Sequence, residues 1–241
     1  MARSLSTKGR FSLAYLLLGA TAGAVLGAFI VFVQRPWPKP PPAWSTWKPG
    51  SASIGEAARE IASHVGGHYR LADGAQLARV ILGPSQAAGS IEGVALADKP
   101  NSVTLYDPSR TIVYTLCGPQ RNCGLQAAET REGSSQLQRE ALELALYTLK
   151  YANAADVAIF FPPLEGEAKT SSVLNFPRDD FGLQLHRPLK VTLPHPAPLS
   201  HGEVDSREVG MIDALTTGHR YRFAVQTATG GRRVLILQPA A

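Results

Sequence analysis

An uncharged run near the N-terminus constrains the fold of this chain more than any other feature. It reads FSLAYLLLGATAGAVLGAFIVFV and covers 23 residues, 11–33. A helix of that length spans roughly 34 Å, and the hydrocarbon layer of a bilayer is about 30 Å thick. Small residues at 20–24 resemble a cleavage site, but the apolar part of a secretory signal covers only ~7–15 residues. The run therefore predicts an uncleaved transmembrane helix.

The charges around this run predict its orientation. Three basic residues precede it within residues 1–10, whereas Arg35 and Lys39 follow it. Because basic residues are retained on the cytoplasmic side, we expect residues 1–10 to form a cytoplasmic tail. No second apolar run of this kind follows in the sequence. The rest of the chain is therefore expected outside the cytoplasm, in a single-pass protein of the cell membrane.

A stripe of small residues marks the same run. Gly19, Gly23 and Gly27 repeat at intervals of four, so they share one face of a helix. Stripes of this kind promote helix association in lipid, although glycine is also common in membrane helices without such a role. The pattern predicts contact with a second copy of the chain or with a partner protein, beside contact with the lipid bilayer.

Residues 34–50 form a proline-rich linker, QRPWPKPPPAWSTWKPG. Proline removes amide donors and fixes φ, so we expect an extended segment. Indole rings and lysines favour the membrane–water boundary, which predicts an interfacial role for Trp37, Lys39, Trp44 and Trp47. Two alternatives stay open, a PxxP ligand for an SH3-type domain and a strap in which Trp44 and Trp47 pack onto the folded domain.

The charge distribution argues against nucleic acid as a partner. The sequence has 24 basic and 19 acidic residues. Six of the basic residues and none of the acidic ones lie in residues 1–50, which leaves 18 basic and 19 acidic residues in 51–241. The folded part is therefore close to neutral and lacks a basic footprint.

Residues 51–241 read as a single α+β domain. A capping-box pattern, Ser53 followed by Glu56, opens a helix over 54–65 that Gly66-Gly67 is expected to stop. A second helix is predicted over 134–152, and β-branched and aromatic residues predict strands over 77–83, 91–97, 102–106, 111–117 and 156–161. The strand, helix and strand from 111 to 161 suggest a βαβ unit with a right-handed crossover if the strands are parallel.

The last third of the domain has weaker patterns. We expect a long polar loop over 164–182, a strand over 187–194 and a helix over 207–215. Alternation over 219–225 predicts a half-buried strand, and Thr229-Gly230-Gly231 turns it into a C-terminal β-hairpin that returns over 232–237.

The two cysteines, Cys117 and Cys123, have five residues between them. Outside the cytoplasm a pair of thiols favours a disulfide, which would stabilise the exit of the strand by roughly 2 kcal/mol. Free or redox-active thiols and a metal site are alternatives. A CxxC redox motif has two intervening residues, however, and a zinc site needs about four ligands.

We find no catalytic signature and no cofactor motif in the sequence. His64 and His68 have the spacing of two metal ligands on a helix, but Gly66-Gly67 is expected to interrupt that helix, so no metal is predicted. A cell-envelope hydrolase is the alternative to a binding protein, with His195, His201, Glu203 and Asp205 as candidate acid–base residues. It requires a pocket that holds at least two of them within hydrogen-bond reach.

Other charged residues have simpler explanations. The carboxylate pairs Glu165/Glu167 and Asp179-Asp180 fit solvated loops better than a hydrolase site, which holds two carboxylates across its substrate. Arg220, Arg222 and Arg232-Arg233 either form a basic patch for an anionic lipid or acidic partner, or are exposed arginines of a sheet.

Four segments of the sequence are similar to segments of other proteins. The glycine-rich run, PPPAWSTWKPG, VYTLCGPQRNCG and REALELALYTLKY resemble an uncharacterised group of single-pass membrane proteins from actinobacteria. The resemblance covers the first two thirds of the chain and implies an envelope location without an activity. We therefore expect a non-catalytic, membrane-anchored binding or accessory protein of the cell envelope.

Overall fold

The chain divides into two units, residues 1–42 and 43–241. The computed structural model describes residues 7–34, 42–71, 73–83, 93–99, 102–118, 123–125, 130–162, 172–197, 204–227 and 233–239. Trp37 and Lys39, predicted at a membrane interface, lie outside these residues.

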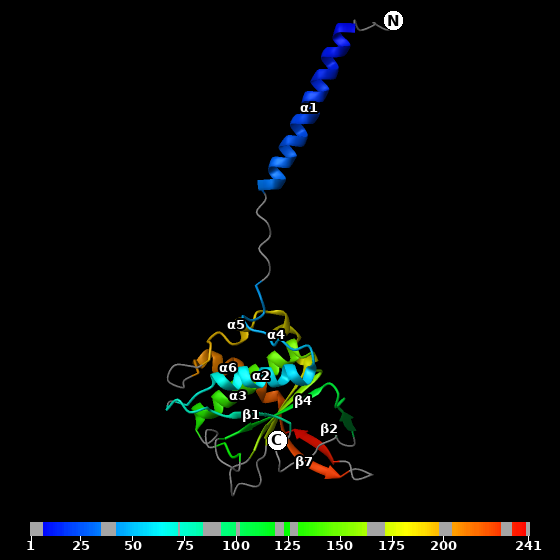
Figure 1. Cartoon of the computed structure of the whole chain (residues 1–241). Coiled ribbons are helices and arrows are strands. Elements are labelled where there is room, and N and C mark those ends of the chain that lie inside the picture. Colours follow the sequence, from blue (N-terminus) through cyan, green and yellow to red (C-terminus); the bar gives the residue numbers. More distant parts are fainter. Residues whose placement is uncertain are drawn as a thin grey trace. The chain divides into compact units, whose positions relative to one another are not determined.

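Unit 1 contains helix α1, Thr7–Gln34 (Figure 1). The prediction of a transmembrane helix over 11–33 is corrected here, because over the described residues no helix is both long and apolar enough to cross a membrane. The side chains that the structure describes in α1 are those of 15–27, 29 and 30.

Unit 2 is built on one mixed eight-stranded sheet, with the order β1-β4-β5-β6-β7-β8-β2-β3. Two neighbouring pairs are parallel, β4 with β5 and β2 with β8. The strands are β1 Arg79–Leu82, β2 Gly93–Lys99, β3 Ser102–Leu105, β4 Thr111–Cys117, β5 Asp156–Phe161, β6 Ser172–Pro177, β7 Arg220–Thr227 and β8 Arg233–Pro239.

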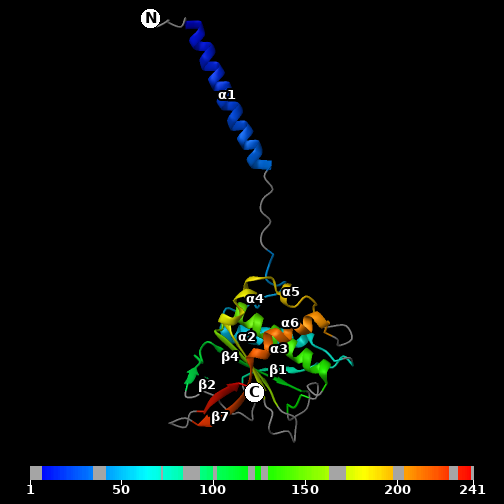
Figure 2. The ribbon, with the colours of Figure 1, turned by 180° about the vertical axis from the view of Figure 1, so that it is seen from behind.

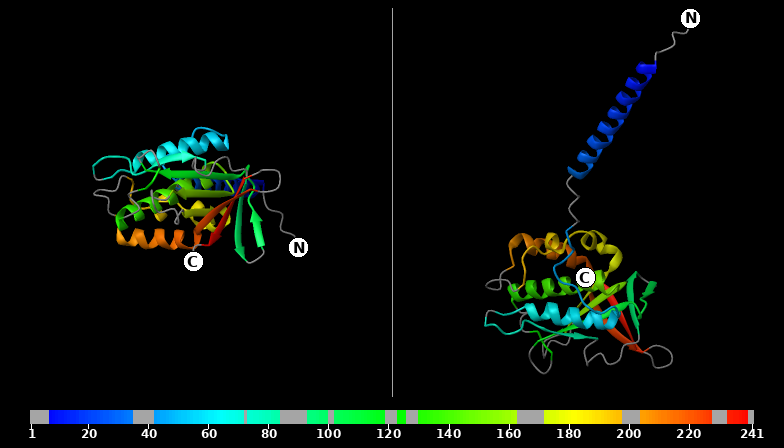
Figure 3. Two further views of the ribbon diagram at one scale, coloured as in Figure 1. Left: turned by 90° about the horizontal axis from the view of Figure 1, so that it is seen from below. Right: turned by 45° about the horizontal axis from the view of Figure 1, so that its top comes forward.

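The helices cover one face of this sheet (Figures 1 and 2). The central helix α3 packs on β5 and against both α2 and α6, as the view from below shows (Figure 3). The helical segments of unit 2 are α2 Ile54–His68, α3 Arg131–Tyr151, η3 Arg178–Phe181, α4 Gly182–His186, α5 Leu189–Thr192, α6 Ser206–Thr216 and η5 Thr217–His219.

Two hydrophobic cores lie on opposite faces of the sheet. The larger one joins the helices to the alternate residues of β4, β5 and β6 that face them, such as Tyr114 and Ile159. The smaller one joins residues of β5 and β6 to residues of β2, β7 and β8, with the Phe160 and Phe223 rings edge to face at 5.0 Å. The residues of β5 and β6 that face away from the helices are therefore buried against residues of β2, β7 and β8.

Several predicted elements are confirmed. The predicted βαβ unit is present as β4, α3 and β5, and its two strands pair in parallel. The C-terminal hairpin is present as β7 and β8, which pair antiparallel from Tyr221–Pro239 to Thr227–Arg233. Helix α6 covers the helix predicted over 207–215.

Two predictions for the last third of the chain are wrong. The expected loop over 164–182 contains β6, whose residues Val173, Leu174 and Phe176 are buried between neighbouring strands. The expected strand over 187–194 contains the short helix α5 instead. Leu189 and Leu193 are four residues apart and both face the core, whereas Val191 between them is exposed, so the apolar spacing is that of a helical turn.

Helix α2 also extends past its expected end, because Gly66-Gly67 does not stop it and the helix continues to His68. A Cβ at position 66 would lie 2.7 Å from Cγ2 of Val80 on β1. Gly66 therefore permits a close approach of α2 to the sheet, and this packing outweighs its low helix propensity.

The domain includes an N-terminal strap, residues 43–51, that lies across its helices. Trp44 is 9% exposed, its Nε1 donates to the Gln184 carbonyl at 2.9 Å, and its ring meets Tyr147 edge-on at 5.3 Å. Trp47 stacks on the His64 ring at 3.8 Å. Both tryptophans therefore pack onto the folded domain, as the strap alternative predicts. The burial of Trp44 corrects its assignment to a membrane interface, which requires an accessible indole.

We expect the substitution Trp44→Ala to lower the free energy of unfolding of the full chain by about 3–5 kcal/mol, because it empties a buried aromatic site. Trp44→Phe keeps a ring and loses the hydrogen bond to the Gln184 carbonyl, so it should cost less. Urea unfolding of the three proteins measures both effects. A loss below ~1 kcal/mol in Trp44→Ala would mean that the strap does not contribute to the fold.

Candidate functional site

A cleft of about 410 Å³ opens between α2 and β1. Its volume lies within the range of small-molecule sites. On one side β1 is the edge strand of the sheet, paired with β4 alone in the strand order. On the other side is α2, which is capped by Ser53, whose Oγ accepts from the Glu56 amide at 3.2 Å. The lining residues are Arg59, Ala62, Ser63, Gly67, Gln76, Arg79, Val80 and Leu82.

The chemistry of this cleft is set by two arginines. Arg59 and Arg79 are both exposed, and neither makes a hydrogen bond or an ion pair with the part of the chain that the structure describes. Ser63 adds a hydroxyl, and Gln76 is held by a 3.0 Å hydrogen bond from its Nε2 to the Gly66 carbonyl. Two arginines without a partner among the described residues, beside neutral polar side chains, favour an anion, because guanidinium matches carboxylate and phosphate geometry. The sequence analysis missed both arginines, since only the pairing of α2 with β1 brings them together.

A buried polar network lies at the other end of α2. We call Tyr69, Arg139, Glu143, His195 and Glu208 the Arg139 network. Arg139 Nε donates to Glu208 Oε1 at 2.8 Å, and the two side chains are 1% and 0% exposed. The guanidinium also donates to the Tyr69 hydroxyl and to the His195 carbonyl. One arginine therefore joins α3, α6, the end of α2 and the segment that follows α5.

The network also orients His195. The second oxygen of the Glu208 carboxylate is 2.8 Å from His195 Nδ1, while the histidine ring stays half exposed. Of the other hydrolase candidates, Asp205 is exposed at the start of α6, and His201 and Glu203 lie outside the described residues. The structure thus pairs His195 with Glu208, a residue that the sequence analysis did not select. Glu208 lies four residues before the buried Ile212 on the inward face of α6, and a single glutamate at such a position gives no pattern by which to recognise a site.

Next to the network, Glu140 is fully buried, and neither of its carboxylate oxygens has a hydrogen-bond partner among the described residues. Burial, followed by the negative charge of Glu143, raises the pKa of the Glu140 carboxyl well above its ordinary value. The pKa of the Tyr69 phenol is also raised, first by burial and then by Glu143. The interior around α3 therefore favours a neutral carboxyl at position 140.

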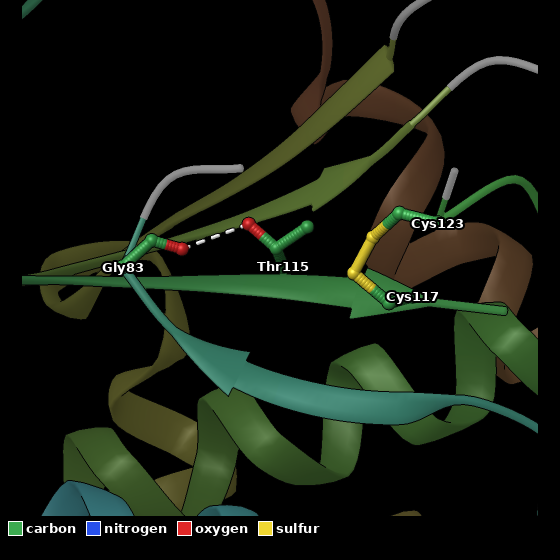
Figure 4. Close-up of a disulfide and its surroundings, with 4 residues drawn as sticks. All are labelled: Gly83, Thr115, Cys117 and Cys123. Atoms are coloured by element: carbon green, nitrogen blue, oxygen red, sulfur yellow. Dashed lines mark hydrogen bonds between the residues drawn. A yellow bond between two sulfur atoms is a disulfide. The ribbon is translucent and has the colours of Figure 1, made fainter. Parts of the chain in front are cut away.

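The cysteine pair is a disulfide, Cys117–Cys123, as predicted (Figure 4). Cys117 ends β4, and Thr115 on the same strand donates to the Gly83 carbonyl at 2.8 Å. The two ends of the loop approach closely, because a Cβ on Gly118 would lie 1.9 Å from the Gly124 carbonyl oxygen. The disulfide fixes the end of β4 and has no ionisable or nucleophilic group left for chemistry.

The remaining candidates are solvated where the structure describes them. Asp179 and Asp180 are exposed in η3, and Asp180 Oδ2 lies 3.9 Å from His219 Nδ1. Arg220 and Arg222 are exposed on β7, so their role as a basic patch stays a prediction. Three further candidates, Glu165, Glu167 and Arg232, lie outside the described residues.

The predicted glycine stripe of α1 is open. Among the described residues, no group outside the helix backbone lies within 4 Å of a Cβ built on Gly19, Gly23 or Gly27. Large side chains of α1 are also exposed, for example Leu16 at 73% and Phe29 at 65%. Association through this helix stays a prediction.

No protein-family model matches this chain, and no curated protein or solved structure is significantly similar to it. The resemblance to actinobacterial single-pass membrane proteins therefore stays a prediction as well.

We expect Glu140→Gln to stabilise the protein by roughly 1–3 kcal/mol at pH 8, because it removes a buried carboxylate without a partner. The folded-state pKa is raised, so the folded chain holds more protons than the unfolded chain above the ordinary value of 4.5. Stability should then fall as pH rises through that window. Urea unfolding at several pH values should show a gain in Glu140→Gln that shrinks toward pH 4.

The matched control for this experiment is Asp213→Asn, which removes an exposed carboxylate from α6. It should change stability by less than ~0.5 kcal/mol at any of these pH values. If Glu140→Gln changed the free energy of unfolding by the same amount at pH 4 and at pH 8, the result would contradict a buried Glu140 carboxyl with a raised pKa.

Proposed function

We propose that this protein is an extracytoplasmic binding protein of the cell envelope that holds an anionic group of its ligand in the α2–β1 cleft. The observation that carries the proposal is that two arginines, Arg59 and Arg79, are among the residues that line one open cleft, and neither has a partner among the described residues. The protein acts by binding and positioning, and nucleic acid is not its ligand because residues 51–241 are close to neutral overall.

The disulfide supports the location. Cys117 and Cys123 are bonded, and structural disulfides persist in oxidising compartments and are rare in the cytosol. An envelope protein that is exposed to such a compartment gains from a covalent link at the end of strand β4. The proposal includes no membrane-spanning helix.

The shape and electrostatics of the cleft support a ligand with carboxylate or phosphate groups. Two arginines, one on α2 and one on β1, are among the residues that line the cleft, and an arginine forms charge-assisted hydrogen bonds with an anion. The apolar side chains of Ala62, Val80 and Leu82 line the cleft as well, which suits a ligand with an aliphatic part next to its anionic group. Each such hydrogen bond contributes about 1.5–3 kcal/mol when one partner is charged.

We therefore expect the full chain to bind succinate and inorganic phosphate, with amide NMR shifts confined to α2 and β1. Because 1.4 kcal/mol corresponds to a factor of ten, Arg59→Gln and Arg79→Gln should each weaken binding about tenfold or more. Tighter binding of succinate would identify a carboxylate ligand with an aliphatic part, and tighter binding of phosphate would identify a phosphoryl group.

The control is Arg207→Gln, which removes an exposed arginine of α6 outside the cleft. It should leave both affinities within a factor of two of those of the unsubstituted chain. Equal loss in Arg207→Gln would mean that only the overall charge matters, and shifts away from α2 and β1 would contradict the cleft as the site.

A further inference from the structure

Two histidines lie on consecutive turns of α2, on a stretch where the sequence predicted an interruption. Gly66-Gly67 separates His64 from His68, but α2 is helical throughout and ends at His68. Residues four apart on a continuous helix lie one above the other on the same face. The helix is therefore not interrupted between His64 and His68, and the two side chains share one face as a pair of metal ligands requires.

The geometry of the pair fits a shared ion. The centroids of the two imidazole rings are 4.5 Å apart and the ring planes are nearly perpendicular, at 84°. Metal–nitrogen bonds to histidine are about 2.0–2.1 Å long, which puts a ring centroid roughly 3.2 Å from the metal. If the two ligand nitrogens subtend about 90° at the ion, as in a tetragonal site, the ring centroids lie about 4.5 Å apart, which is the separation that the structure has.

Both rings are available to an ion. His64 is partly exposed and His68 is exposed, and neither ring makes a hydrogen bond or an ion pair within the described residues. The Trp47 indole stacks on His64 with centroids 3.8 Å apart and planes 8° apart, which holds that ring in one orientation. Glu60, one turn before His64, is occupied, because its two oxygens accept from the Gly50 and Ser51 amides.

We propose that His64 and His68 bind one divalent transition-metal ion at the C-terminal end of α2, with water in the remaining coordination positions. Imidazole ligands suit copper, nickel and zinc, and the Irving–Williams order places Cu²⁺ highest for such a site. Among the described residues no group of three or more His, Cys, Asp or Glu side chains is placed to share an ion. The site is therefore an open, exchangeable one and not a closed structural zinc centre.

The position of this site gives it a structural effect. An ion bound to both histidines links the two ends of the turn that contains Gly66-Gly67, the part of α2 with the lowest helix propensity. Because the unfolded chain does not hold the two rings together, the ion binds the folded state preferentially and raises its stability. The stacked Trp47 connects the strap to the same site, so metal also orders the start of the domain.

The test is a titration of the full-length chain with CuCl2, followed by calorimetry and by tryptophan fluorescence. We expect one Cu²⁺ per chain, a higher Tm with Cu²⁺ than without it, and quenching of Trp47 emission. His68→Asn should weaken Cu²⁺ binding at least tenfold, and so should His64→Asn, with circular dichroism showing that both variants fold. Trp47→Phe should keep the stoichiometry and lose most of the quenching.

The matched control is His186→Asn, which removes an exposed histidine at the end of α4. It should bind Cu²⁺ as the unsubstituted chain does. Unchanged Cu²⁺ binding in His68→Asn, or a loss of binding in His186→Asn, would overturn the proposal. Cu²⁺ binding that leaves Trp47 emission unchanged would also overturn it, since the ion would then lie elsewhere.

Discussion

The buried ion pair between Arg139 and Glu208 is the contact on which the helical layer depends. It joins the central helix α3 to α6, and the remaining donors of Arg139 reach the end of α2 through Tyr69 and the segment after α5 through the His195 carbonyl. Two fully buried charges are costly unless each one is paired and hydrogen-bonded. Because the guanidinium has five donors in a rigid fork, one arginine can connect four segments of the helical layer.

Helix α2 contacts the Arg139 network, the strap and the edge strand β1. One end of it is tied to the network through Tyr69, its middle contacts the strap through His64 and Trp47, and Gly66 brings it close to β1. The anion cleft lies on the side of α2 that faces β1, and the two histidines lie on its last two turns. Both proposed binding properties therefore depend on the position of one short helix, and a change that displaces α2 should affect both.

The sequence predicts the parts of this fold that depend on local patterns. TIVYTLC is rich in β-branched and aromatic residues and is strand β4, and the long apolar helix after it returns the chain to the parallel strand β5. The errors occur where distant contacts decide. Gly66 is helical because Val80 packs on it, SVLNFP is a strand because it has strands on both sides, and Leu189 and Leu193 form a helical turn because both reach the core. Arg59 and Arg79, or Arg139 and Glu208, have no sequence relation that would pair them.

The most direct test of this account is a double-mutant cycle on the central ion pair, with Arg139→Met, Glu208→Met and both substitutions together. Each single substitution leaves a buried charge without its partner and should cost about 3–5 kcal/mol of unfolding free energy. The double variant should be more stable than the sum of the single effects predicts, by at least ~2 kcal/mol. Additive effects within ~0.5 kcal/mol would contradict the account, because Arg139 and Glu208 would then stabilise the helical layer independently.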